Sequence, residues 1–156
     1  MVGLGYDVHR LAPGESLVLG GVTLESKLGT VAHSDGDVLV HAIMDALLGT
    51  LALGDIGLHF PDTSPEWKGA DSIAMLRRVV HIIQHEGAHV VNVDATVALE
   101  APRLRPHIEA MRAKLAEAIG IDMKRVSVKA TTSEKLGFVG REEGIAAYAV
   151  AQVEYD

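Results

Sequence analysis

Apolar residues recur along this chain with two different periods, which predict strands interleaved with helices. Five segments have the pattern of strands: residues 2–9, 16–24, 89–100, 125–131 and 145–154. In the second of them, Gly20-Gly21 stands where a type I′ hairpin turn requires positive φ. In the third, alternation places on one face Val91, Val93, Ala95, Val97 and Leu99.

Three helices are predicted between these strands, from Ser34 to about Leu53, from Asp71 or Ser72 to Gly87, and over about 107–119. Ser34 can cap the first helix, and Asp37 three residues later completes a pattern like a capping box. The buried stripe of the second helix is Ile73, Leu76, Val80 and Ile83. Polar or glycine-rich connections are expected at residues 25–33, 54–70 and 133–144. The order β-β-α-α-β-α-β-β indicates an α+β fold in which helices cover one face of a single sheet.

Composition narrows the class of protein. A chain of 156 residues with 48% hydrophobic residues can bury a core of its own, so we expect a single catalytic domain over residues 1–156. The formal net charge of −7 argues against nucleic acid as a partner. The N-terminus has no pattern of a targeting signal, and no apolar run reaches the ~18 residues of a membrane span. We expect a cytoplasmic protein with no membrane partner.

Three side chains are candidate metal ligands. Asp7 and His9 lie two apart in a predicted strand, so both point to one face. His41 lies in an apolar helical stretch, where an unpaired imidazole would be costly to bury. Two His and one Asp leave a fourth position open, as in catalytic zinc sites, and the absence of cysteine restricts any metal site to His and carboxylate ligands. A surface pair at a strand end and a hydrogen-bonded core His are the structural alternatives.

Other polar groups have weaker signals. Asp37 and Asp45 flank His41 at i−4 and i+4, and either can orient its imidazole or compete as a ligand. The N–H groups at the loop entering the first helix favour anions, although an ordinary helix cap is the simpler interpretation of this loop. The hydroxyls of residues 131–133 offer phosphate contacts, although a solvated turn is the simpler interpretation there. A set of three further imidazoles is interpreted as solvated: His81, His85 and His89.

Seven short motifs follow one another along the chain: Gly5–His9, Ala32–Asp37, Asp45–Gly49, Gly54–Gly57, Phe60–Thr63, Lys68–Ser72 and Val128–Phe138. In this order they resemble the 2-C-methyl-D-erythritol 2,4-cyclodiphosphate synthase family of the non-mevalonate route to isoprenoids. The resemblance covers essentially the whole chain. It implies a homotrimer with active sites between subunits, which cyclises 4-diphosphocytidyl-2-C-methyl-D-erythritol 2-phosphate and releases CMP.

The resemblance also implies roles for individual residues. Asp7, His9 and His41 would hold Zn²⁺, and Glu134 would hold Mg²⁺ or Mn²⁺ at the substrate's diphosphate. His33 and Thr132 match positions that steady the phosphoryl transition state. Asp55 and Gly57 match positions that contact the ribose, and Ser34, Phe60 and Asp62 match positions that contact the methylerythritol part. The positions that match contacts to the cytosine are Leu99, Ala101, Arg103, Leu104 and Arg105. Those that match contacts to the phosphates are Thr131 and Ser133. Positions near the threefold axis, where an isoprenoid diphosphate can be enclosed, are Phe138 and Arg141.

Three residues depart from the family pattern, and two other functions compete with the cyclase. Ser64 stands where many relatives carry Asp, and Arg103 and Arg105 replace what are often Lys and an apolar residue. A metal-dependent phosphohydrolase would use the same ligands to activate water. A non-catalytic protein would bind a nucleotide or an isoprenoid diphosphate without turnover.

Overall fold

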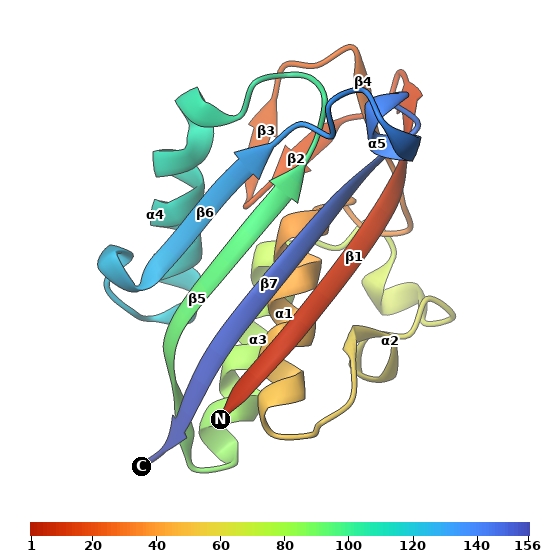
Figure 1. Ribbon diagram of the computed structural model, residues 1–156. Helices are drawn as coiled ribbons and strands as arrows, with labels where there is room; N and C mark the ends of the chain where they lie inside the picture. The colour runs from red at the N-terminus through yellow and green to blue at the C-terminus, as the bar shows by residue number, and fades with distance from the viewer.

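Five strands form a mixed sheet in the order β4-β1-β7-β5-β6 in the computed structural model, which describes residues 1–156 (Figure 1). Their bounds are β1 Val2–Pro13, β4 Leu28–Val31, β5 Ala88–Ala98, β6 Val126–Thr131 and β7 Gly144–Tyr155. β5 and β6 pair in parallel, whereas β7 pairs antiparallel with both β1 and β5. The four longer strands were predicted from the sequence and are confirmed.

Three helices cover one face of this sheet, as predicted: α1 Val38–Thr50, α3 Ser72–His85 and α4 Ile108–Ile119 (Figure 1). α1 packs on β1 and β7, α3 packs against α1 and β5, and α4 lies against β6 and α3. The predicted stripe of α3 is buried, and Gly120 ends α4 with a φ of 82°. The core is therefore one continuous layer of aliphatic side chains between the helices and the sheet.

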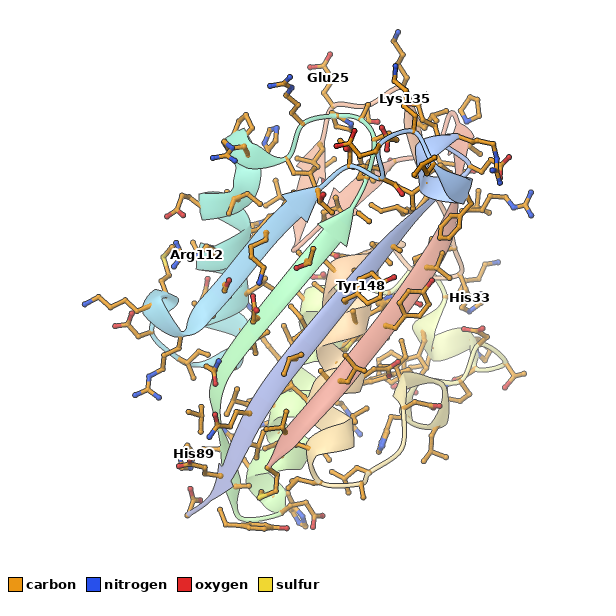
Figure 2. All side chains as sticks on the ribbon, in the orientation of Figure 1. Glu25, His33, His89, Arg112, Lys135 and Tyr148 are labelled. Carbon is orange, nitrogen blue, oxygen red and sulfur yellow. The ribbon has the colours of Figure 1, made fainter.

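The opposite face of the sheet carries no helix (Figure 1). Large apolar side chains lie exposed along β1 and β7 there: Val2, Leu4, Tyr6, Val8, Tyr148 and Val150. The rings of Tyr6 and Tyr148, which are cross-strand partners, have centroids 5.0 Å apart. Figure 2 shows Tyr148 on the front of the sheet, away from the helices. This face is referred to below as the open face.

Two strand predictions differ from the structure. Residues 16–24 form the expected hairpin, β2 Leu17–Leu19 and β3 Val22–Leu24, but it is a separate two-stranded sheet. The edge of the main sheet is β4, in a segment that was predicted to be a connection. β4 is short, and its partners are the last four residues of β1, so it depends on a pairing that its own sequence pattern does not reveal.

The start of the first helix also differs. α1 begins at Val38 with Asp37 as its cap, not at Ser34. Gly36 has a φ of 72°, which interrupts any helix that starts before it. Ser34 instead accepts a hydrogen bond from the N–H of Gly36, at 3.3 Å.

The predicted connections contain short elements: α2 Ile56–His59, a 3₁₀ turn at Pro65–Trp67, and α5 Gly137–Gly140. Further 3₁₀ turns precede α4 and β6, at Arg105–His107 and Met123–Arg125. A bulge between Val90 and Asn92 turns Val91 away from the buried face on which it was predicted to lie. None of the helices has the length and apolar character needed to cross a membrane.

Candidate functional site

Close packing of α1 on β1 brings the three candidate metal ligands together. Gly3 and Gly5 face α1, and a Cβ at these positions would collide with the carbonyl oxygens of Ala46 and Ala42. Because β1 carries glycine there, the helix axis can approach the strand closely. His41, one residue before Ala42, therefore faces the next inward positions of β1.

Those inward positions are Asp7 and His9, and the three donor atoms form a compact triangle. Asp7 Oδ2 lies 2.9 Å from His9 Nε2 and 3.1 Å from His41 Nδ1, and the two nitrogens are 3.2 Å apart. A tetrahedral zinc ion with bonds of about 2.0–2.1 Å separates its ligand atoms by about 3.3 Å. The donor set and its spacing therefore fit a zinc ion with its fourth position open toward the cavity.

Proton binding at this triangle is strongly perturbed. Burial raises the pKa of Asp7, but its hydrogen bonds with His41 and His9 outweigh that effect and lower the pKa to about 2. Burial lowers the pKa of His41, yet the contact with Asp7 and the nearby negative charges leave it raised. Asp7 is thus an anion at neutral pH, as a metal ligand must be.

A cavity of about 360 Å³ opens in front of the three ligands. It collects most of the residues that the family resemblance assigns near the metal, namely His33, Ser34, Gly57, Phe60 and Asp62. Asp55 caps the adjoining helix α2 by accepting the N–H of Leu58 at 3.0 Å. The structure therefore brings the predicted metal, ribose and methylerythritol groups to one end of α1.

The two carboxylates that flank His41 along the helix do not support it. Asp37 turns toward the β2–β3 hairpin and accepts the N–H groups of Gly20 and Gly21. Asp45 accepts the N–H of Ile56 at 2.8 Å, and burial raises its pKa. Sequence spacing placed both acids near the imidazole, but their orientation was decided by unpaired N–H groups of distant segments.

The predicted cytosine and phosphate groups form a second, separate hollow. It has about 180 Å³ and is lined in part by Leu99, Arg103, Leu104, Arg105, Thr131 and Thr132. Ala101 and Ser133 adjoin it in the chain. No residue lines both hollows. Figure 2 shows Lys135, next to Glu134, at the top of the molecule, whereas His33 lies to the side beyond β1.

Glu134, the predicted second metal ligand, is exposed at a φ of 53° and does not join the Asp7–His9–His41 group. Its loop is held by Glu100, whose Oε1 accepts the N–H of Ser133 at 2.7 Å. Sequence reasoning missed this role of Glu100, which precedes Ser133 by 33 residues in the chain.

The remaining predicted residues lie outside both hollows. Arg141 pairs with Glu143 at 3.0 Å, which raises the pKa of the guanidinium, and Phe138 is partly exposed. His89 pairs with Asp156 on the surface, and His81 and His85 are exposed, as predicted.

Sequence reasoning also missed Ser72, which contacts His41, and Asp35, which contacts Ser72. Ser72 Oγ lies 3.0 Å from His41 Nε2, and it hydrogen-bonds to Asp35. Both residues lie in motifs that marked the resemblance, Lys68–Ser72 and Ala32–Asp37. The motifs were the available signal, although no spacing rule connects residues 37 positions apart.

A His₂–Asp donor set beside a cavity, on this α+β scaffold, defines an enzyme with a candidate metal centre. The chain matches the YgbB family over residues 1–154. It is similar to the 2-C-methyl-D-erythritol 2,4-cyclodiphosphate synthase of Pseudomonas aeruginosa (strain UCBPP-PA14), with 61% identity over 150 residues that cover 96% of each chain.

Solved structures show the same likeness. A 2C-methyl-D-erythritol-2,4-cyclodiphosphate synthase in its CDP-bound form superposes with a TM-score of 0.92 at 37% identity, covering 99% of this chain and 100% of the other. The CDP complex of IspF from Plasmodium falciparum gives 0.87 at 30% identity, covering 99% and 96%. The chain therefore belongs to the YgbB family of 2-C-methyl-D-erythritol 2,4-cyclodiphosphate synthases and is an enzyme, a lyase.

Proposed function

We propose that residues 1–156 form one catalytic domain that converts 4-diphosphocytidyl-2-C-methyl-D-erythritol 2-phosphate into the 2,4-cyclodiphosphate and CMP. An oxygen of the 2-phosphate bonds to the β-phosphorus. The bond from that phosphorus to the oxygen bridging the α-phosphate breaks, and CMP leaves with this oxygen. The attacking phosphate is already an anion, so the chain has to supply positioning and charge compensation more than a base.

The observation that carries this proposal is the triangle of Asp7 Oδ2, His9 Nε2 and His41 Nδ1 beside the cavity, in a chain of this family. These three residues would hold Zn²⁺, and Glu134 would hold Mg²⁺ or Mn²⁺. When bound, the two ions supply positive charge at the crowded phosphates.

The protein groups around the metal ligands bind and orient the substrate. His33 faces the cavity and would donate a hydrogen bond to a phosphoryl oxygen, while Thr132 would do so from the second hollow. Ser34 also faces the cavity and would contact the methylerythritol part. Asp55 and Gly57 would contact the ribose, and Arg103 would keep a positive charge near the nucleotide. The CDP-bound relative supports a cytidine nucleotide as the ligand.

We further propose that each active site forms between two chains of a homotrimer. The residues assigned to one substrate lie in two hollows with no lining residue in common, which supports a site that a neighbouring chain completes. The open face, with Leu4 71% and Val2 69% exposed, is the kind of apolar surface that marks a protein interface. Beside the axis, Phe138 and Arg141 would contact an isoprenoid diphosphate.

Product analysis tests the reaction. In ³¹P NMR of the protein with substrate, Zn²⁺ and Mg²⁺, two coupled cyclic-diphosphate resonances should appear together with CMP. Linear phosphates would instead indicate the phosphohydrolase, and tight binding without turnover would indicate a binding protein.

The variant His41→Ala tests the metal centre. It should lose its zinc and nearly all turnover, because two ligands hold zinc far more weakly than three. His81→Ala, which changes an exposed imidazole on α3, is the matched control and should keep both. Full activity with one zinc per chain in His41→Ala would refute the assignment.

A further inference from the structure

His41 has a hydrogen-bonded partner on each side of its ring. Nδ1 faces Asp7 and His9, whereas Nε2 lies 3.0 Å from Ser72 Oγ and 3.2 Å from Ser34 Oγ. The ring is 7% exposed and Ser72 is 0% exposed, so water does not compete for the Nε2 contact.

The direction of the hydrogen bonds on the Nε2 side is set by Asp35. Its Oδ2 accepts the N–H of Ser72 at 2.9 Å, and its Oδ1 accepts the N–H of Asp37 at 3.1 Å. The same Oδ1 hydrogen-bonds to Ser72 Oγ. A carboxylate accepts and does not donate, so the Ser72 hydroxyl has to donate its proton to Asp35.

Ser72 Oγ then has only lone pairs to offer to His41. A hydroxyl that donates its hydrogen bond to a carboxylate can only accept one from the imidazole, so Nε2 has to carry a proton. When zinc is bound, Nδ1 is therefore the nitrogen that offers its lone pair to the ion, in place of the proton that it shares with Asp7 Oδ2 without metal. Three lone-pair donors within 3.2 Å of one another form an arrangement that a cation stabilises.

We propose that Ser72 and Asp35 are positioning residues, which hold His41 as its Nε2–H tautomer and so commit Nδ1 to the metal. The inference rests on the proposed metal centre and deepens it. Carboxylate partners orient metal-binding imidazoles in many proteins, and here Ser72 lies between the carboxylate of Asp35 and the imidazole of His41. Asp35 belongs to the loop that precedes α1, and Ser72 is the first residue of α3, so the same contacts join this loop to the start of α3 beside the cavity.

Zinc affinity is the first test, measured on the full-length holoenzyme by competition with a chromogenic chelator. Ser72→Ala should weaken zinc binding roughly 10- to 100-fold, because it removes the nearer acceptor for Nε2–H, the one whose direction Asp35 fixes, and leaves only Ser34 Oγ at 3.2 Å. Asp35→Asn should also weaken it, since in either orientation the amide NH2 faces the backbone N–H of Ser72 or of Asp37, which displaces Ser72 from its position beside His41. Asp71→Asn is the matched control, because it alters the exposed cap of the same helix, α3, without contacting His41. It should lower the melting temperature and leave zinc affinity unchanged.

The second test reads the imidazole directly, from ¹⁵N-histidine spectra of the zinc-loaded protein. The wild type should coordinate zinc through Nδ1 and show a slowly exchanging Nε2–H, and Ser72→Ala should lose that slow exchange. Coordination through Nε2 in the wild type overturns the proposal. So does a Ser72→Ala protein that keeps both its affinity and a protected Nε2–H.

A failure of the metal centre itself is distinguishable from a failure of this inference. A wild-type chain that binds no zinc refutes the centre. The proton on His41 Nε2 in the metal-free protein then still decides the role of Ser72. A protected Nε2–H that is lost in Ser72→Ala supports it, and an Nε2 without a proton contradicts it.

Discussion

Asp37 is a fully buried carboxyl group whose ionisation is decided by two opposed effects. Burial raises its pKa to about 6, although the N–H groups of Gly20, Gly21 and Val40 all point at its oxygens and act in the opposite direction. Between the usual carboxyl pKa and this raised value, the folded chain keeps a proton that the unfolded chain has lost. The free energy of unfolding that Asp37 contributes should therefore fall as pH rises through this window.

The variant Asp37→Asn removes this titration at nearly constant shape. The stability advantage of the wild type over the variant should shrink by roughly 2–3 kcal/mol between about pH 4 and pH 7, in urea denaturation with a chelator present. Asp122→Asn, at the exposed cap of a 3₁₀ turn, corrects for the general effect of removing one carboxylate. An advantage that grows with pH would show that the three N–H groups prevail and hold the pKa of Asp37 below its usual range.

Single residues of the metal centre were predictable where local geometry decides their direction, and not elsewhere. Asp7 and His9 follow from the two-residue period of a strand. Asp37 was expected beside His41 because helix spacing allows it, but its oxygens are needed by a hairpin 16 and 17 residues earlier. The link from His41 through Ser72 to Asp35 depends on the loop before α1 meeting the first residue of α3, a contact that no periodicity encodes.

The contact between α1 and β1 is the element-scale feature on which the site depends. Gly5→Ala would place a methyl group against the carbonyl oxygen of Ala42 and push the helix from the strand. We expect a loss of roughly 1–3 kcal/mol in the free energy of unfolding, together with weaker zinc binding, because His41 moves with the helix. Urea denaturation with and without zinc measures both effects.

Gly49→Ala is the matched control for this prediction, on the same helix. Its added methyl group has its nearest neighbour at 4.0 Å, the Cα of Gly3, so it meets no obstacle. Alanine favours a helix over glycine by roughly 0.5–1 kcal/mol, and this variant should be at least as stable as the wild type. A Gly5→Ala protein with the stability and zinc affinity of Gly49→Ala would contradict the role given to the close packing.

Element prediction succeeded where a long segment carries its own pattern. The four long strands and three main helices have such patterns, whereas β4 is defined only by its pairing with Arg10–Pro13. The start of α1 was misplaced because Ser34 is a good cap by residue type, and the left-handed conformation of Gly36 that excludes it is not visible in a capping pattern. The bulge at Val90–Asn92 likewise shifts one residue of an otherwise correct strand.

At the scale of the whole molecule, the open face and the two hollows both support the proposed homotrimer. The helices bury one face of the sheet, and the apolar residues on β1 and β7 leave the other face in need of a partner. An active site shared between chains explains why Glu134 does not join His41 within one chain. The resemblance read from the sequence predicts which residues belong to the site, but no residue pattern indicates which chain supplies each of them.

Mixing two inactive variants tests this sharing directly. His41→Ala damages the metal half of the site, and Glu134→Ala damages the diphosphate half. If the two halves come from neighbouring chains, unfolding and refolding the variants together in equal amounts should create sites in which both halves are intact. Each half has a one-in-two chance of being intact, so activity should recover to about a quarter of the wild-type value in a closed ring of like interfaces. Each variant refolded alone provides the background, and light scattering of the mixture confirms the trimer. A mixture no more active than its parents would place both halves of the site within one chain.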